Sequence, residues 1–157
     1  MKKALRHSLF FLLFVGILFI GFLKINPPLA YGSIGTTSDK HAVIVAIGNK
    51  HFVGNIHFTE VSINGRDIPK KVKVQVSDSN TGFVMSDIVT AATDLVKLED
   101  YRSIKLLPNS SPRLSDQIDP SYQNTIYGLS IAEDVPIERI DVAYTYLGLT
   151  FEETIQL

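Results

Sequence analysis

The pattern of hydrophobic and polar residues divides the chain into one long apolar run near the N-terminus and a series of short segments after it. Residues 9–23 are apolar without interruption. With its neighbours the run reaches about 18 residues, close to the lower limit of the roughly 17–25 that cross a bilayer. Backbone amides in hydrocarbon must be paired within the segment. We therefore expect a single membrane-spanning helix.

The charges around this run predict its orientation. Lys2, Lys3 and Arg6 precede it and Lys24 follows it. Basic flanks stay in the cytoplasm, which predicts a single-pass cell-membrane protein with an extracytoplasmic C-terminal domain. The length of the run and Lys24 favour a retained anchor. Residues 30–32 (Ala-Tyr-Gly) nevertheless have the small-x-small pattern of a cleavage site, so secretion after signal cleavage is the alternative.

The pattern changes after residues 1–32, which we assign to the membrane anchor or signal peptide. Residues 33–40, rich in Gly, Ser and Thr, predict a flexible tether. Residues 42–47 are apolar and largely β-branched, which is typical of a buried strand. Residues 55–63 predict a second strand whose phase changes near Thr59-Glu60, as a β-bulge would cause.

The remaining strands are predicted mainly by alternation. Residues 71–77 carry valines on one side and polar residues on the other, which indicates a strand with one face in water. Residues 140–146 and 149–157 alternate and meet at Leu147-Gly148, the pattern of a β-hairpin. Two further strands are expected from shorter segments, residues 103–107 and 124–131.

These segments predict about seven short strands. Over residues 41–157 they support an all-β domain, an antiparallel β-sandwich of immunoglobulin or fibronectin type III character, preceded by one transmembrane helix. A small open barrel is the structural alternative. Residues 85–98 fit either a short helix or a strand and a loop. Residues 108–123, which contain three prolines, predict a long surface loop.

Composition and charge narrow the chemistry. The chain has no cysteine, which removes thiol nucleophiles, thiolate metal sites and a lipid-modified cysteine anchor. An exported chain without cysteine also favours a bacterial origin. Beyond residue 32 there are 11 basic and 16 acidic residues. This balance provides no basic patch, so we expect no nucleic-acid partner.

Several strand segments resemble those of uncharacterised small membrane-anchored proteins of Gram-positive bacteria. The resemblance rests on Gly54-Asn55-Ile56, Val61-Ser62-Ile63-Asn64, Pro69 with Val74-Gln75-Val76-Ser77, Ile126-Tyr127-Gly128-Leu129 and Tyr144-Thr145-Tyr146-Leu147-Gly148-Leu149. It covers most of the chain and implies an N-terminal hydrophobic helix followed by an extracytoplasmic immunoglobulin-like β domain. Its motifs are strand patterns, and they imply no functional residue.

The histidines and one acidic turn are the candidates for a metal site. His7, His41, His51 and His57 show no metal-binding spacing, so we interpret them as surface or edge residues. Residues 78–82 (Asp-Ser-Asn-Thr-Gly) resemble the first half of a calcium loop but lack its second half, and a tight polar turn explains them. We therefore predict no metal and no cofactor.

The acidic residues and serines offer no catalytic arrangement. Glu152 and Glu153 would face opposite sides of a strand, so they cannot act together on one bond. The serines lack the Gly-x-Ser-x-Gly and Ser-x-x-Lys patterns of nucleophiles. Glu153 lies on the apolar face of its strand. Either it reaches water at a sheet edge, or it is a buried acid with a partner such as Arg139.

Five tyrosines in the second half of the chain are the remaining candidates for a binding surface: Tyr101, Tyr122, Tyr127, Tyr144 and Tyr146. Tyrosines on one sheet face can form a platform for a sugar or a peptide. Packing in the core with the hydroxyl at its rim is the more common role, and we favour it here.

These features predict a membrane-tethered extracytoplasmic interaction module that is not an enzyme, with no catalytic, cofactor-binding or metal-binding residues and no small-molecule substrate. Its expected partners are the membrane, through the N-terminal helix, and another membrane or envelope protein. Contact is expected through a sheet edge or through residues 108–123. The alternative is a cleaved, secreted binder of envelope polymer or peptide, and a third class is an enzyme whose site has no sequence signature.

Overall fold

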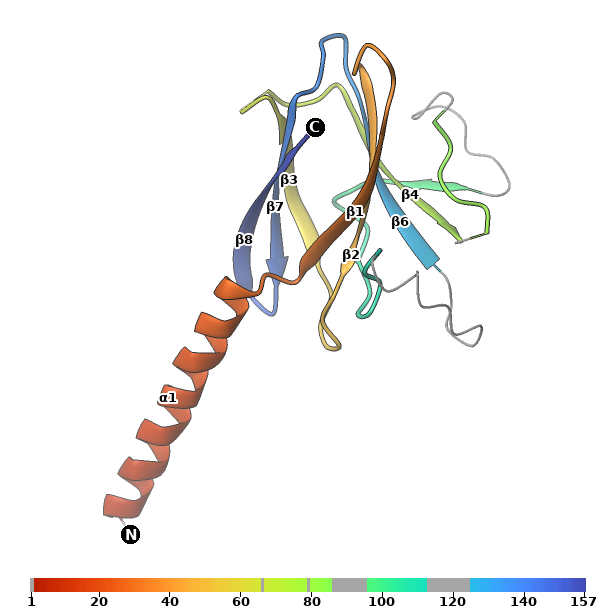
Figure 1. The fold of residues 1–157 in the computed structure, drawn as a ribbon. Helices are drawn as coiled ribbons and strands as arrows, with labels where there is room; N and C mark the ends of the chain where they lie inside the picture. The colour runs from red at the N-terminus through yellow and green to blue at the C-terminus, as the bar shows by residue number, and fades with distance from the viewer. Residues whose placement is uncertain (1, 66, 79, 86–95, 113–124) are drawn as a thin grey trace.

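The computed structural model describes residues 2–65, 67–78, 80–85, 96–112 and 125–157. In these residues an N-terminal helix precedes eight strands: α1 (Lys2–Ile25), β1 (Leu29–Thr36), β2 (Ala42–Asn49), β3 (His57–Ile63), β4 (Lys71–Asp78), β5 (Lys97–Glu99), β6 (Thr125–Ala132), β7 (Arg139–Tyr146) and β8 (Leu149–Gln156). Figure 1 shows α1 projecting as one rod from an end of the strand domain. A mostly β protein with one N-terminal apolar helix is thereby confirmed.

The strands form two antiparallel sheets. The larger sheet has the order β1-β2-β6-β4-β5, and the smaller sheet has the order β3-β7-β8. β7 alternates between buried and half-buried residues, as its sequence pattern predicts for a strand with one face on a core. In β2 every residue after Ala42 is buried, because this strand is covered on both faces.

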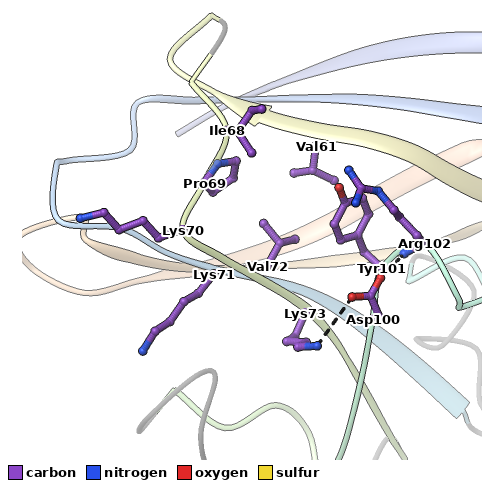
Figure 2. A pocket seen from close by; sticks show the side chains of 10 residues that line it. All are labelled: Val61, Ile68, Pro69, Lys70, Lys71, Val72, Lys73, Asp100, Tyr101 and Arg102. Atoms are coloured by element: carbon purple, nitrogen blue, oxygen red, sulfur yellow. Dashed lines mark hydrogen bonds and ion pairs between the residues drawn. The ribbon is translucent and has the colours of Figure 1, made fainter.

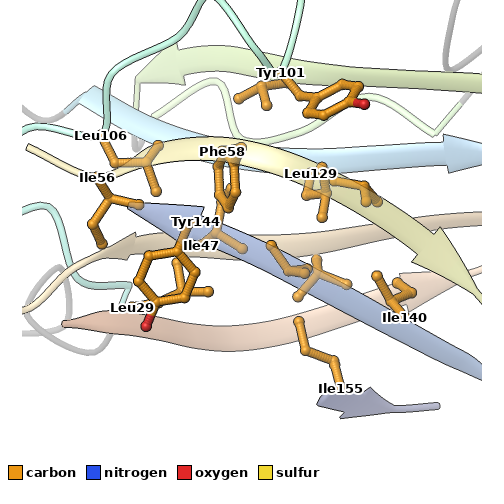
Figure 3. Close-up of a cluster of buried hydrophobic side chains, with 14 of the residues drawn as sticks. Leu29, Ile47, Ile56, Phe58, Tyr101, Leu106, Leu129, Ile140, Tyr144 and Ile155 are labelled. Carbon is orange, nitrogen blue, oxygen red and sulfur yellow. The ribbon is translucent and has the colours of Figure 1, made fainter. Parts of the chain in front are cut away.

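One hydrophobic core joins the two sheets and the end of the helix. Figure 3 shows the part of it that lies among the strands. Its members include Leu23 of α1, Leu29, Ile47 and Leu129 of the larger sheet, and Phe58, Ile140, Tyr144 and Ile155 of the smaller sheet. Fully burying an aliphatic or aromatic side chain stabilises a fold by roughly 1.5–3 kcal/mol. The helix end is therefore part of the same packed unit as the strands.

Two predicted features of the smaller sheet, a β-bulge and a hairpin turn, are confirmed. The register of β3 against β7 shifts between Phe58 and Glu60, which is the expected β-bulge. β7 and β8 pair over their whole length and are joined by Leu147 and Gly148, whose φ angles are +49° and +78°. Two successive residues with positive φ suit the tight turn of a hairpin, because such a turn matches the twist of the strands.

The outer face of the larger sheet is covered by two segments of the chain. Gln75 on β4 donates from Nε2 to the backbone oxygen of Val84 at 2.8 Å, and its Oε1 accepts from the Val84 amide at 3.0 Å. The Ser110 amide donates to the backbone oxygen of Asn49 at 2.9 Å. Gln75 and Ser77 are consequently buried, so the water-exposed face predicted for residues 71–77 was wrong at these two positions.

Three predictions of local structure also require correction. Residues 33–36 belong to β1 and pair with β2, so the flexible tether expected at residues 33–40 was wrong over these four positions. Residues 103–107 contribute one bridge, Ile56 to Leu106, and no strand. Residues 108–112 lie against the larger sheet and so are no free surface loop. Residues 85–98, for which we expect either a short helix or a strand and a loop, lie largely outside the described residues, and only Lys97 and Leu98 are seen to join β5. The loop beyond residue 112 also lies outside the described residues.

Gly48 provides a test of this covering segment. A Cβ atom at this position would lie 1.8 Å from the backbone oxygen of Ser110, so Gly48→Ala must displace backbone. We expect it to lower the free energy of unfolding by about 2 kcal/mol or more, measured by chemical denaturation of the full chain in detergent. Gly35→Ala is the control, because the nearest atom to its added Cβ is Met85 Sδ at 3.4 Å. Equal unfolding midpoints for the two variants would contradict this packing.

Candidate functional site: the junction of the helix and the domain

The last turn of α1 is the only part of the apolar helix that packs against the described strands. Of the apolar window His7–Ile25, 6% is buried. Leu23 accounts for this burial: it is 1% exposed and belongs to the core cluster. Between Leu9 and Phe22 the helix presents large apolar side chains to its surroundings. A helix that is apolar on all sides and bare along its length is suited to lipid rather than to water.

Polar and aromatic contacts hold the same turn on the domain. Lys24 Nζ donates to the backbone oxygen of Thr150 at 2.8 Å and lies 4.5 Å from the centre of the Phe151 ring. On the other side, the Phe22 ring meets the His51 ring edge-on, with 6.2 Å between their centres. These contacts involve β8 and the loop between β2 and β3, so the helix end is held by both sheets.

The connection from helix to sheet is short and fixed. Three residues, 26–28, separate the end of α1 from the start of β1. The Asn26 amide donates to the Phe22 oxygen at 2.9 Å, and the Lys50 amide donates to the Pro28 oxygen at 3.0 Å. His51 Nε2 also lies 3.1 Å from the Asn26 oxygen, a hydrogen bond when this nitrogen carries the proton. The domain therefore has a defined position relative to the helix.

Tyr144 is buried beside this junction. Its ring stacks on Phe151 with 5.4 Å between centres and an interplanar angle of 11°. The hydroxyl is enclosed and makes no hydrogen bond of standard geometry within the described residues. Burial raises the pKa of this hydroxyl; a contact of poor geometry with the Leu29 backbone lowers the pKa in part, and nearby Glu153 raises it further. The hydroxyl therefore stays in its neutral form.

Glu153 is half-buried on the edge strand β8, so of the two alternatives the sheet-edge position fits and the buried pair with Arg139 was wrong. The register places Glu153 opposite Val142, whereas Arg139 lies opposite Gln156 at the strand end. Arg139 Nε instead donates to Asp141 Oδ2 at 2.9 Å. Burial raises the pKa of the Glu153 carboxyl, and the positive charge of Lys50 opposes this rise. Glu153 is thus a carboxyl at the edge of the core whose charged form is disfavoured by burial, rather than half of a close ion pair.

A shallow hollow lies between the β3–β4 connection and residues 100–102, and Figure 2 shows its lining. Lys70 and Lys71 point away from it (Figure 2). Lys73 Nζ lies 3.7 Å from Asp100 Oδ2. Lys70 contacts Glu133 and Asp134, and the hydrogen bond and charge of Asp134 raise the pKa of Lys70. Since these charges are paired at its rim, no reactive groups converge inside the hollow.

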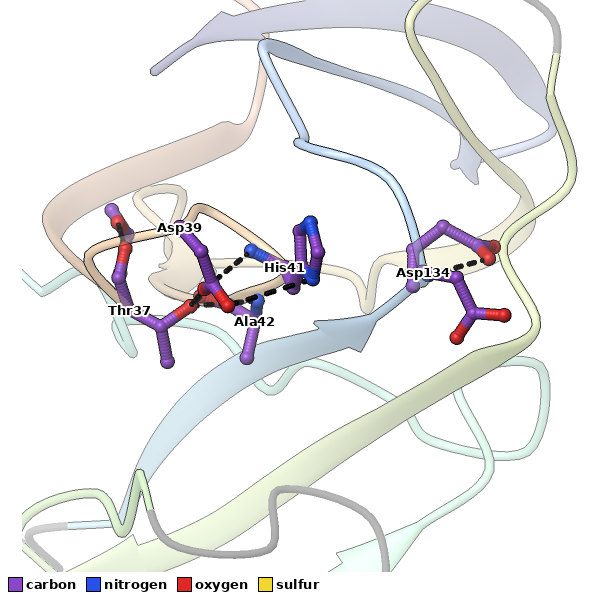
Figure 4. A network of polar contacts seen from close by, with 7 residues as sticks. Thr37, Asp39, His41, Ala42 and Asp134 are labelled. Carbon is purple, nitrogen blue, oxygen red and sulfur yellow. Dashed lines mark hydrogen bonds and ion pairs between the residues drawn. The ribbon is translucent and has the colours of Figure 1, made fainter.

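The β1–β2 turn contains a compact polar network (Figure 4). Thr37 Oγ1 donates to Asp39 Oδ1 at 2.6 Å, and the His41 amide donates to the same oxygen at 3.2 Å. The Thr37 bond and then the His41 amide lower the pKa of the Asp39 carboxyl. This network closes a tight connection between two strands. Among the residues that the structure describes, no three His, Asp or Glu side chains are grouped to hold a metal ion.

The residues singled out in the sequence are dispersed over the fold. Of the histidines, His7 lies on α1, His57 lies on β3, His41 lies in the turn of Figure 4, and His51 lies at the helix junction. His51 is the position that the sequence interpretation undervalued, because no local pattern marks a contact with residues 22 and 26.

Asp78 forms a polar turn. Its Oδ1 accepts from the amides of Asn80 and Thr81 at 2.8 and 2.9 Å. These bonds, with that from the Thr81 amide the largest influence, lower the pKa of the Asp78 carboxyl. The turn interpretation is therefore confirmed.

The tyrosines pack in the core. Tyr101, Tyr127, Tyr144 and Tyr146 are all buried, so the favoured core role is confirmed for these four and the binding platform was wrong. Tyr122 lies outside the described residues. The Tyr146 hydroxyl donates to the backbone oxygen of Val53, which ties the end of β7 to the β2–β3 loop. Its hydroxyl at the rim of the core is the arrangement expected of a buried tyrosine.

Comparison with known proteins adds no relative: no family model, no curated protein and no solved structure matches this chain. The resemblance to membrane-anchored proteins of Gram-positive bacteria therefore stays a prediction. The described residues define a class, a mostly β domain packed against the end of one N-terminal apolar helix that is long enough to cross a membrane.

Glu153 gives a prediction for pH dependence. A carboxyl whose pKa is raised by folding contributes most to stability below its unfolded pKa, near 4.5, and that contribution is lost as the pH rises through the folded pKa. Glu153→Gln removes the charge, so we expect its melting temperature at pH 7 to exceed that of the parent by on the order of 1–3 °C. The difference should vanish at about pH 4. Glu152→Gln, on the exposed side of β8, is the control, and an equal gain in both variants would contradict the assignment.

Proposed function

We propose that the protein is a membrane-anchored interaction module, held on the outer face of a cell membrane by α1 and acting by binding rather than by catalysis. The basic residues that precede the apolar run support a cytoplasmic N-terminus and an extracytoplasmic domain. The observation that carries the proposal is the packing of the last helical turn into the core. A helix end used in this way is a structural element of the mature domain.

The same observation favours retention of the helix over cleavage. A cut after Gly32 would remove Leu23 and Leu29 from the core and would divide β1, whose Tyr31 pairs with Ile47. A signal peptide is discarded after export, so a fold that depends on its last turn would be damaged by its removal. Secretion after cleavage is therefore the less favoured candidate.

The strand order supports an immunoglobulin-like or fibronectin III-like origin for the domain. In an immunoglobulin constant-type fold, strands A, B, E and D form one sheet and strands C, F and G form the other. Taking β1, β2, β3, β4, β6, β7 and β8 as A to G in chain order gives the sheets A-B-E-D and C-F-G, with β5 as an addition at the edge of the first. We infer this topology for the domain. Folds of this kind commonly serve in recognition, an argument by analogy alone.

The partner that fits this design is another membrane or envelope protein. A domain fixed beside the bilayer meets membrane-bound partners at a high effective concentration. The sheets end in four edge strands, β1, β5, β3 and β8, and an open edge can accept a strand from another chain. In the hollow beside the β3–β4 connection the charges of Lys70 and Lys73 are paired at the rim, and no three His, Asp or Glu side chains among the described residues are grouped to hold a metal ion, which is consistent with binding as the activity.

Leu23 tests whether the helix is part of the domain. Leu23→Ala leaves a cavity in the core and should lower the free energy of unfolding of the full chain in detergent by about 2–4 kcal/mol. Leu18→Ala is the matched control, because Leu18 is 57% exposed on the same helix. We expect it to change stability by less than about 0.5 kcal/mol. Identical effects of the two substitutions would mean that the helix is separable from the domain.

In-cell crosslinking of a C-terminally tagged chain tests the function itself. We expect a full-length band in the membrane fraction that shifts to one recurrent mass, which identifies a membrane or envelope partner. External protease should remove the tag from intact cells, since the domain is expected outside. A shorter, uncrosslinked species in the medium would contradict anchoring, and a full-length chain that is always alone would contradict the role as an interaction module.

A further inference from the structure

Three exposed apolar side chains gather at the end of the domain from which α1 leaves. Phe52 and Val53 in the β2–β3 loop are 82% and 68% exposed, and Leu147 in the β7–β8 turn is 50% exposed. We call these three residues the loop patch. A Cβ atom on Gly54 would lie 2.8 Å from Leu147 Cδ2, so the loop and the turn form one surface. Figure 1 shows both connections at the helix end of the domain.

The loop that carries Phe52 and Val53 is held firmly from behind. Asn49, which is fully buried, donates from Nδ2 to the Gly54 oxygen at 2.9 Å, and its Oδ1 accepts from the His51 amide at 3.0 Å. The Asn109 amide donates to the His51 oxygen at 3.0 Å, and the Tyr146 hydroxyl binds the Val53 oxygen. The polar backbone thus faces inward, and the apolar side chains remain at the tip. Contact with water does not favour this arrangement, because it leaves apolar side chains exposed.

The loop patch lies at the depth of the last helical turn. The apolar window His7–Ile25 has 19 residues. At about 1.5 Å per residue this is close to the roughly 30 Å of a bilayer core. Phe22 is inside this window, and its ring centre is 6.2 Å from that of His51, the residue before Phe52. If α1 spans the membrane, the loop tip reaches the boundary between acyl chains and headgroups.

We propose that the loop patch inserts into the outer-leaflet interface of the bilayer that α1 crosses, as a second membrane contact that fixes the tilt of the domain. This inference rests on the proposed anchoring by α1. Three features support a lipid partner: continuity with the apolar helix, an exposed phenylalanine of the kind that membrane-surface segments bury at the headgroup boundary, and Lys24 at the same level. Three side chains are also far fewer than the 20–30 residues that each partner contributes to a standard protein interface.

Because the chain has no cysteine, single cysteines can report the depth of chosen positions. Phe52→Cys tests the loop patch. Ile68→Cys is the matched control, because Ile68 is also apolar, is 78% exposed and lies in the β3–β4 connection at the far end of the domain. Leu13→Cys, in the middle of α1, tests the span itself. Each variant of the full chain carries a water-sensitive fluorophore and is reconstituted into vesicles of phosphatidylcholine and phosphatidylglycerol in equal parts.

Lipids with a nitroxide near the headgroup should quench the label at position 52 by about twofold or more and leave the label at position 68 nearly unchanged. Lipids with a deep nitroxide should quench the label at position 13 most strongly. Quenching at 13 without quenching at 52 would overturn the loop contact and leave the anchor standing. Absence of quenching at 13 would overturn the anchor. If the fluorescence of the label at position 52 reports loss of water but the lipid nitroxides do not quench it, the patch binds a second copy of the chain. That result also overturns the lipid contact.

Discussion

The insertion of Leu23 into the core is the contact on which the arrangement of this molecule depends. It makes the last turn of α1 a member of the packed domain, and Lys24 and Phe22 hold the same turn against β8 and the β2–β3 loop. A flexible connection would have decoupled the domain from the helix. Here the three residues between α1 and β1 are fixed by backbone hydrogen bonds, so position and orientation pass from helix to sheet.

The second constraint is the covering of the larger sheet on both faces. Its inner face meets the smaller sheet, while Gly48 and Gly128 on its outer face leave room for Ser110 and Phe83. A side chain at either glycine would collide with the overlying segment, so small residues are the condition for this third layer. The side-chain amide of Gln75 hydrogen-bonds both backbone groups of Val84, as a neighbouring strand would. These two bonds satisfy the buried Gln75 side chain and the Val84 backbone together.

The sequence predicted what local patterns encode. An apolar run located β2, patterns of alternation located β3, β4, β6, β7 and β8, the phase change located the bulge of β3, and Leu147-Gly148 marked the hairpin. It failed at β1, whose glycine, serine and threonine content suggests coil, because an edge strand is held by backbone bonds to β2 rather than by apolar side chains. The junction could not be predicted either: contacts of residues 22–24 with residues 51, 150 and 151 have no local signature.

A rigid junction also changes what binding would cost. A free tether of eight residues would let the domain wander over roughly 16 Å and turn in all directions, and a partner would have to restrict that motion on binding. Because the helix end packs into the core, the domain already loses this freedom to move relative to the helix when the chain folds. If α1 spans a membrane as proposed, the edge strands then face fixed directions relative to it, so a partner in the same bilayer could be matched in height and angle as well as in sequence. We therefore propose that this fold provides placement beside the membrane rather than chemistry at any one residue.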